Sequence, residues 1–355
     1  MIRVALVGAG GMARQYRAVY ARLPQVKFVL AVDVDDEPLL ACRALGVERT
    51  SRRFADALAD DIDMLDISTP NHLHEEQAVA ALAAGKHVLL QKPIANSLEA
   101  ADRIVAAARA ARGTLGMYMF SYANPWFWAI KRLLDDGALG AIQSVRCRDA
   151  HRGGLRAPAD AWRASRDKTG GGSFTQLSIH GINLTQWWLG RRIDQVMAWS
   201  DNQYCPNVGG DDVTVAIVRF DGPNARMPAS ATARSLYGVF DSGWASDVLT
   251  REIYGTAGWA RYTEHGNALE VQLDAPHASP WLSYDTPGEV RRFLMPPPRW
   301  DDVSSPLNPH RVFVERLAAQ QEPLMTAEHG RRDLAVVMAA YESARTGRAA
   351  HVSQA

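Results

Sequence analysis

IRVALVGAGGMA, residues 2–13, is the stretch of sequence that decides the fold. Ile2 to Val7 is a continuous apolar run of strand length, and it leads directly into glycines. The residues that follow, Met12 to Leu23, predict a helix. In this strand–turn–helix context, a G-x-G-x-x-G/A spacing is typical of dinucleotide binding.

Within that turn, Gly8, Gly10 and Ala13 occupy the three positions of the spacing. We expect Gly8 to make the tight turn and Gly10 to let the backbone approach a pyrophosphate. Ala13 would keep helix and strand close, and Gly11 and Met12 would face the cofactor at the helix N-terminus. The alternative is a glycine turn in another doubly wound fold that binds no dinucleotide.

Asp33 strengthens the dinucleotide interpretation. It follows the strand-like run Val26 to Val32, about 25 residues after the first glycine, where a carboxylate can accept both ribose hydroxyls. No arginine immediately follows Asp33, and a carboxylate there repels a 2′-phosphate. The sequence therefore favours NAD, with NADP as the less favoured cofactor.

The rest of the first 120 or so residues alternates short apolar segments with helical ones. Further strands are predicted at Met64 to Ile67, His87 to Leu90 and Thr114 to Met119, and helices at Glu75 to Ala84 and Leu98 to Ala111. This alternation predicts a parallel sheet covered on both faces, in an α/β dinucleotide-binding domain spanning residues 1–121.

After Tyr122 the pattern changes to longer, alternating strands with few helices. Strands are predicted at Ile142 to Arg148, Val213 to Phe220, Ala229 to Ala233 and Asp247 to Tyr254, and helices at Phe174 to Leu189, Pro309 to Gln320 and Leu334 to Arg345. Residues 122–355 are therefore expected to form a second, α+β domain with a large, mostly antiparallel sheet.

The composition points to a small-molecule partner. The 355 residues carry 39 Lys+Arg against 39 Asp+Glu, so no basic excess suggests nucleic acid. No segment approaches the roughly 20 apolar residues that span a bilayer, and the apolar start is not a signal peptide. Three widely spaced cysteines, Cys42, Cys147 and Cys205, favour a reducing cytoplasm over a disulfide scaffold or metal site.

Lys92 stands in the turn Gln91-Lys92-Pro93, at the carboxyl end of a predicted buried strand. In open α/β sheets that edge forms the ligand crevice. A lysine there can place its ammonium against a developing alkoxide, although a solvated strand-end lysine is the simpler interpretation from position alone.

Motifs in four separated places together resemble the Gfo/Idh/MocA family, named in part for glucose–fructose oxidoreductase and inositol dehydrogenase. They are STPNHLH (68–74), GKHVLLQKP (85–93), AWR (161–163), GGGSFTQLSIH (170–180) and YESARTGR (341–348). The resemblance covers nearly the whole chain. It implies an amino-terminal Rossmann domain, a substrate-binding second domain, and a homodimer or homotetramer built on an exposed sheet face.

The resemblance also implies which residues form the site. The cofactor-binding set is Gly8, Gly10, Gly11, Met12, Asp33, Ser68, Thr69, Pro70, Asn71, His74, Gln91 and Lys92. The catalytic set is Lys92, His180 and Gln176, and the substrate set is Tyr122, Trp162, Arg163, Gln176, His180 and Asn183. No metal ligand is expected.

Residues 173–189 also show two adjacent stripes at helical spacing. The apolar stripe contains Leu177 and Trp188, and the neighbouring stripe contains Gln176 and His180, one turn apart. A histidine in that place is a structural residue by position alone; the resemblance makes it the acid/base.

Three positions depart from the family pattern. Gln91, Gln176 and Asn183 stand where relatives carry carboxylates. An amide still forms hydrogen bonds, but it cannot ionise or relay a proton. The loss of nearby negative charge is expected to make protonated His180 less favourable.

These features predict an NAD(P)-dependent oxidoreductase of carbohydrate metabolism that acts on a secondary alcohol of a sugar, inositol or sugar derivative. His180 would accept the hydroxyl proton while Lys92 stabilises the developing negative charge. Two alternatives remain open: an NAD-dependent glycosidase or lyase with transient oxidation and no net redox, and a non-enzymatic dinucleotide or sugar sensor.

Overall fold

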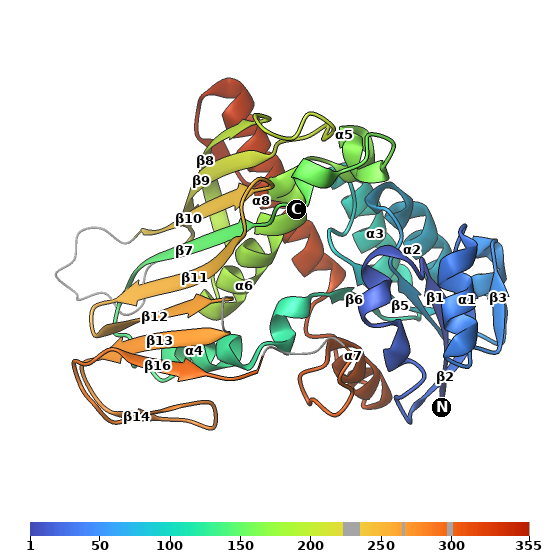
Figure 1. Ribbon diagram of the computed structural model, residues 1–355, viewed down its shortest axis with the longest axis horizontal. Coiled ribbons are helices and arrows are strands. Elements are labelled where there is room, and N and C mark those ends of the chain that lie inside the picture. The colour runs from blue at the N-terminus through green and yellow to red at the C-terminus, as the bar shows by residue number, and fades with distance from the viewer. Residues whose placement is uncertain (223–234, 265–266, 297–300, 355) are drawn as a thin grey trace. The chain divides into compact units, whose positions relative to one another are not determined.

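The computed structural model describes residues 1–222, 235–264, 267–296 and 301–354. The chain divides into two compact units (Figure 1). Unit 1 contains Met1–Ala123 and Pro298–Arg331, and unit 2 contains Asn124–Pro297 and Arg332–Ala355. The strand expected at Ala229 to Ala233 lies outside the described residues. Within them, no helix combines the length and apolar character needed to cross a membrane.

Unit 1 is built on a six-stranded sheet in which every pair of neighbouring strands is parallel. In spatial order the strands are β3 (Arg49–Ser51), β2 (Val26–Val32), β1 (Ile2–Val7), β4 (Met64–Ile67), β5 (His87–Gln91) and β6 (Leu115–Tyr118). The chain leaves the central β1 toward β2 and later returns to β4 on its other side. That reversal creates a ligand crevice at the carboxyl ends of β1 and β4. The expected parallel sheet is confirmed.

Helices follow the strands of unit 1, with one departure from the expected pattern. Its α-helices outside the carboxyl-terminal segment are α1 (Asp36–Ala44), α2 (His74–Ala83) and α3 (Leu98–Ala110), and its 3₁₀ turns include η3 (Phe54–Leu58), η4 (Asn71–Leu73) and η5 (Phe120–Ala123). Instead of one helix over Met12 to Leu23, there are two short 3₁₀ segments, η1 (Gly11–Gln15) and η2 (Arg17–Val19). Tyr16 interrupts them with φ −134°, and its buried ring packs on His310. This tertiary contact overrides the local helical preference.

Residues 298–331 belong to unit 1, whereas the sequence placed them with the second domain. They include α7 (Pro309–Ala318). Phe313 packs so closely on β6 that a Cβ added at Gly116 would lie 2.5 Å from its ring. The Met117 amide donates to the Met325 carbonyl at 2.8 Å. These contacts join segments about 200 residues apart, so no local pattern announces them.

Unit 2 carries a nine-stranded sheet, and among its described strands only β7 and β10 pair in parallel. In spatial order its strands are β16 (Arg291–Leu294), β13 (Ala268–Leu273), β12 (Gly258–Thr263), β11 (Val248–Gly255), β7 (Ile142–Ala150), β10 (Leu236–Gly243), β9 (Val213–Phe220), β8 (Ile193–Asp201) and β17 (Ala350–His351). A small hairpin pairs β14 (His277–Ala278) with β15 (Ser283–Tyr284). The expected mostly antiparallel sheet is confirmed.

Helices cover one face of this sheet. The helical segments are α4 (Pro125–Asp135), η6 (Gly154–Arg156), η7 (Trp162–Ala164), α5 (Arg166–Thr169), the π-helical turn η8 (Phe174–Ser178), α6 (Ile179–Leu189) and α8 (Ala327–Thr346), which belongs to unit 2 from Arg332 on. A Cβ at Gly181 of α6 would lie 2.9 Å from Cys147 of β7, so helix and sheet nearly touch there. Ser343 of α8 accepts a hydrogen bond from the Ala198 amide of β8 at 3.0 Å.

Candidate active site

The glycine turn of unit 1 has the geometry that the sequence predicted for Gly8. Its φ is +85°, and an added Cβ would lie 2.8 Å from the backbone of Ser68 and Thr69. The turn after β1 and the loop after β4 are therefore in backbone contact, which only glycine permits. The amide of Gly10 donates to Asp33 Oδ2 at 3.0 Å.

Asp33 follows β2 and thus links the end of that strand to the turn after β1. Its Oδ1 accepts from the Asp35 amide at 3.0 Å, and the side chain remains half-buried at the edge of the turn. Arg52 contacts the segment that follows Asp33, a proximity that the sequence did not predict. Its guanidinium donates to the Val34 carbonyl and pairs with Asp36 at 2.6 Å. Both side chains of this ion pair are largely exposed.

His74 joins the loop after β4 to the loop after β5. The imidazole is fully buried, and its two nitrogens lie 2.9 Å from the carbonyl oxygens of Thr69 and Pro93. Burial lowers the pKa of His74 to about 4, so the ring is neutral. The neutral ring can donate to one of these carbonyl oxygens, and its contacts link the two loops.

Lys92 directly precedes Pro93, whose carbonyl oxygen contacts His74. It follows β5 immediately, and its peptide bond to Pro93 is cis. It is half-buried. The Lys92 amide donates to Gln91 Oε1 at 3.1 Å, so the amide that replaces the expected carboxylate still accepts a hydrogen bond. The residues predicted to bind the cofactor, in the glycine turn, the 68–71 loop and the 91–92 turn, thus lie at strand ends that share one sheet edge.

The residues of this edge fit a dinucleotide. An added Cβ at Gly11 meets nothing within 4 Å, and Gly10 leaves its amide beside a carboxylate suited to a ribose. The expected long helix behind the turn is replaced by η1, so the phosphate would be held by turn amides without a full helix dipole. Within the described residues, no group of three acidic, histidine or cysteine side chains could hold a metal.

In unit 2, Asp211 organises the glycine-rich loop before η8. Its buried carboxylate accepts hydrogen bonds from five donors: the Gly172 and Phe174 amides, and the hydroxyls of Ser173, Thr214 and Tyr341. A Cβ at Gly172 would lie 1.9 Å from the Asp211 carbonyl oxygen. The glycines therefore serve the approach of two backbone segments. Asp211 was not among the residues that the sequence predicted for the site, and its only local signal is GGDD at 209–212.

The helical segment after this loop carries Gln176 on η8, and His180 and Asn183 on α6. All three are at least nine-tenths buried. The expected division into a core stripe and a site stripe is not observed, because both stripes are largely enclosed. Leu177, which the stripe placed in the core, is only half-buried.

The remaining substrate candidates have different surroundings. Trp162 is half-buried on η7, and the Arg163 guanidinium lies 4.3 Å from its ring centroid. Tyr122 is buried in unit 1, where its hydroxyl donates to Met325 Sδ at 3.0 Å. That contact gives Tyr122 a packing role in its unit.

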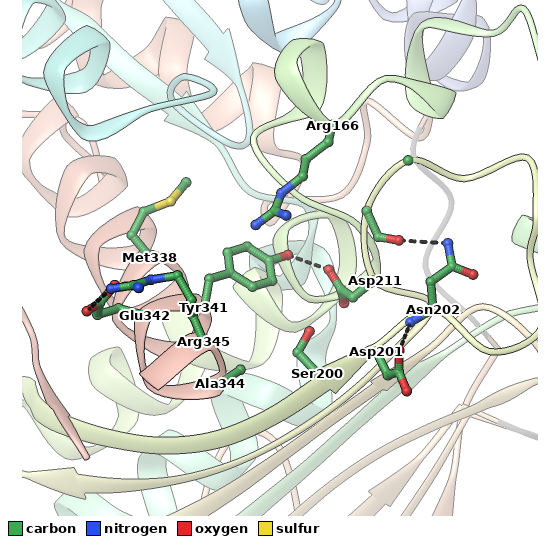
Figure 2. A pocket seen from close by; sticks show the side chains of 12 residues that line it. Arg166, Ser200, Asp201, Asn202, Asp211, Met338, Tyr341, Glu342, Ala344 and Arg345 are labelled. Atoms are coloured by element: carbon green, nitrogen blue, oxygen red, sulfur yellow. Dashed lines mark hydrogen bonds and ion pairs between the residues drawn. The ribbon is translucent and has the colours of Figure 1, made fainter. Parts of the chain in front are cut away.

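Unit 2 contains a pocket of about 520 Å³ between α8, the end of β8 and the loop before β9. Figure 2 shows the side chains that line it. Tyr341 points its hydroxyl at Asp211 from one wall, while Arg166 lies 5.8 Å over the Tyr341 ring. Glu342 and Arg345 pair with each other at 2.8 Å. None of the predicted catalytic or cofactor-binding residues lines this pocket, which instead adjoins Asp211 behind the glycine-rich loop.

Comparison with protein families gives two adjacent matches. Residues 2–119 match the model described as an oxidoreductase family with an NAD-binding Rossmann fold, and residues 127–261 match the GFO/IDH/MocA C-terminal domain. Together the two models span more than half of the chain.

Named relatives act on sugars. Levoglucosan dehydrogenase of Pseudarthrobacter phenanthrenivorans is 25% identical over 75% of this chain and 71% of its own length. The 1,5-anhydro-D-fructose reductase of Ensifer adhaerens is 26% identical over 99% of each chain. A solved structure of levoglucosan dehydrogenase in complex with NADH covers all of both chains with a TM-score of 0.84 at 22% identity.

Proposed function

The chain belongs to the Gfo/Idh/MocA oxidoreductase family, with an NAD-binding Rossmann domain, and we propose that its substrate is a secondary alcohol of a sugar, inositol or sugar derivative. The observation that carries this proposal is the place of Lys92. It emerges at the carboxyl edge of the parallel sheet, on the same edge as the glycine turn and Asp33. The sugar substrates named for the relatives support the substrate class.

The cofactor would be held by the edge of unit 1. The glycine turn, from Gly8 to Met12, would hold the pyrophosphate, with Gly11 and Met12 offering their amides because those of Gly8 and Gly10 donate to Val32 and Asp33. Asp33 would accept the ribose hydroxyls. The loop after β4 and Gln91 line the remaining site; its members are Ser68, Thr69, Pro70 and Asn71. His74 contributes by holding this loop against the turn of Lys92.

Bound NAD⁺ would supply the hydride acceptor for the carbinol carbon of the substrate. His180 accepts the proton of the hydroxyl group, and the Lys92 ammonium hydrogen-bonds the oxygen as negative charge develops on it. Gln176 orients His180 or the substrate through hydrogen bonds, since it cannot ionise. Trp162 and Arg163 form a wall against the sugar, and Asn183 supports the helix of His180.

Lys92→Ala is the test of this assignment. We expect the variant to bind NAD⁺ with an affinity close to wild type in a fluorescence titration, while kcat/KM falls by at least about 100-fold. Lys27→Ala serves as the matched control, because Lys27 is an exposed lysine of unit 1 paired with Glu48. Turnover near wild type in Lys92→Ala would contradict the proposal.

Absorbance of NADH over a panel of sugars and inositols defines the reaction type. A net dehydrogenase accumulates NADH with its preferred substrate, whereas a transient oxidation cycle consumes substrate without accumulating it. The named relatives are a dehydrogenase and a reductase, which favours net redox chemistry.

The proposal extends to assembly and location. One face of the unit 2 sheet exposes four large apolar side chains on adjacent strands: Trp199, Val215, Ile217 and Tyr237. An apolar face of this kind marks an interface, and we assign it to a second copy of this chain in a homodimer.

The proposed location is the cytoplasm. The three cysteine thiols are buried and free, in keeping with a reducing compartment.

A further inference from the structure

Asp333 of α8 is a buried acid that the proposed mechanism does not use. Its side chain is fully buried. Oδ2 accepts a hydrogen bond from Asn183 Nδ2 at 2.6 Å, and Oδ1 accepts one from Gln186 Nε2 at 2.8 Å. Both donors lie on α6, the helix of His180. Across the described ranges, no Lys, Arg or His forms an ion pair with Asp333.

This arrangement is costly for stability alone. A buried carboxylate without a cationic partner loses its hydration, and apolar side chains of similar size usually pack two helices at lower cost. Burial raises the pKa of Asp333 to about 7, against the opposing effects of the Arg332 charge and the Asn183 and Gln186 amides. Perturbed acids of this kind concentrate at functional sites.

The hydrogen bonds of Asp333 give the Asn183 amide a definite orientation. With Nδ2 donating to the carboxylate, Oδ1 is the acceptor that the amide presents to its other surroundings. Asn183 stands three residues after His180, so the two side chains lie on neighbouring turns of one helix face. Gln186 continues the chain of contacts, because its Oε1 accepts from the Ile193 amide of β8 at 3.1 Å.

We propose that Asp333 is a positioning residue for the sugar oxidation proposed above: its carboxylate orients the Asn183 amide and thereby the turn of α6 that carries His180. The inference rests on the proposed function. Gln176 and Asn183 are amides where the family resemblance implies acids. In this chain the carboxylate that contacts α6 comes from α8 instead.

Asp333→Asn separates this role from a structural one. Because the folded pKa is raised above its ordinary value, wild-type stability falls as pH rises from about 4 to about 7, and the neutral variant escapes this loss. We therefore expect Asp333→Asn to unfold at the same or a higher temperature at pH 8, yet to show a kcat/KM about tenfold lower. Infrared spectra at pH 6 should contain a protonated carboxyl band that the variant lacks.

A reciprocal exchange provides the rescue. Asn183→Asp alone places two carboxyl groups in contact and should impair activity more than Asp333→Asn. The double variant N183D/D333N restores one carboxylate and one amide with exchanged positions, and we expect its kcat/KM within about threefold of wild type. Glu342→Gln is the control, since Glu342 is an exposed acid of the same helix paired with Arg345.

The outcomes are distinct. Wild-type kcat/KM in Asp333→Asn, loss of activity only in step with loss of stability, or failure of the exchange to restore activity would each overturn the positioning role. A wild-type protein that oxidises no sugar or inositol would overturn the proposed function, and with it this inference.

Discussion

At the scale of single residues, the buried imidazole of His74 shows how one side chain can organise a cofactor edge. It contacts carbonyl oxygens on two loops that are about 24 residues apart, and one of these loops carries Lys92. The neutral ring carries one N–H, so its loss would leave one buried carbonyl group without a donor, at about 1–3 kcal/mol. His74 therefore affects Lys92 by holding the loop that carries it in place.

His74 also carries a prediction about pH. Its pKa is lowered to about 4 in the folded state, so the unfolded state binds more protons between about pH 6.5 and pH 4. Wild-type stability attributable to His74 is present above that range and is lost as pH falls through it. Urea unfolding of wild type and His74→Gln should show their difference in free energy of unfolding shrinking by about 2 kcal/mol from pH 6.5 to pH 5. A difference independent of pH would mean that His74 is not buried in its neutral form.

The amide substitutions look different once their partners are known. Gln91 keeps an acceptor on the Lys92 amide, and Asn183 donates to Asp333. The sequence predicted a site that had lost negative charge along α6. Tertiary structure returns one ionisable carboxyl group to that helix from a position 150 residues away.

At the scale of elements, the start of the helix that carries Gln176 and His180 depends on Asp211. Backbone amides at a helix start have no partners within the helix, and the Asp211 carboxylate satisfies those of Gly172 and Phe174. A carboxylate at this end also interacts favourably with the helix dipole.

Asp211→Ala should therefore destabilise unit 2 by about 3–5 kcal/mol, because several buried donors lose a charged acceptor together. Thermal unfolding followed by circular dichroism measures the effect. Asp160→Ala is the control, an exposed aspartate of the same unit. A loss below about 1 kcal/mol would show that water entering from the pocket in Figure 2 replaces the carboxylate.

At the scale of the whole molecule, the open face of the nine-stranded sheet sets the expected assembly. Trp199 is 61% exposed and pairs across strands with Val215, and Ile217 follows on the same face at 46% exposure. Large apolar side chains in such a cluster are rarely left in water.

Ile217→Glu should shift the protein from dimer to monomer, since it places a charge at the centre of an apolar interface. Light scattering coupled to size-exclusion chromatography reports the mass directly. Val290→Glu, at an apolar residue exposed outside the cluster, should leave the mass unchanged. A monomeric wild type, or a dimer that survives Ile217→Glu, would refute the interface.

The sequence by itself determined the features that depend on local pattern. Apolar runs of strand length marked β1, β2, β4 and β5, and glycine spacing marked the turn after β1. Gly8 has a positive φ and a close backbone contact, and both require glycine. The residue type alone can therefore indicate such a position. The motifs around Lys92 and His180 likewise identified the family.

Only the tertiary structure decided what depends on contacts between distant segments. The return of residues 298–331 to unit 1 and the interruption of the helix at Tyr16 both follow from packing on α7 and its surroundings. Asp333 carries no local motif and Asp211 only the short GGDD stretch, so their importance comes from which donors the fold brings to them. Burial without a counter-charge is a property of the folded chain, so the acid that acts on α6 could be recognised only there.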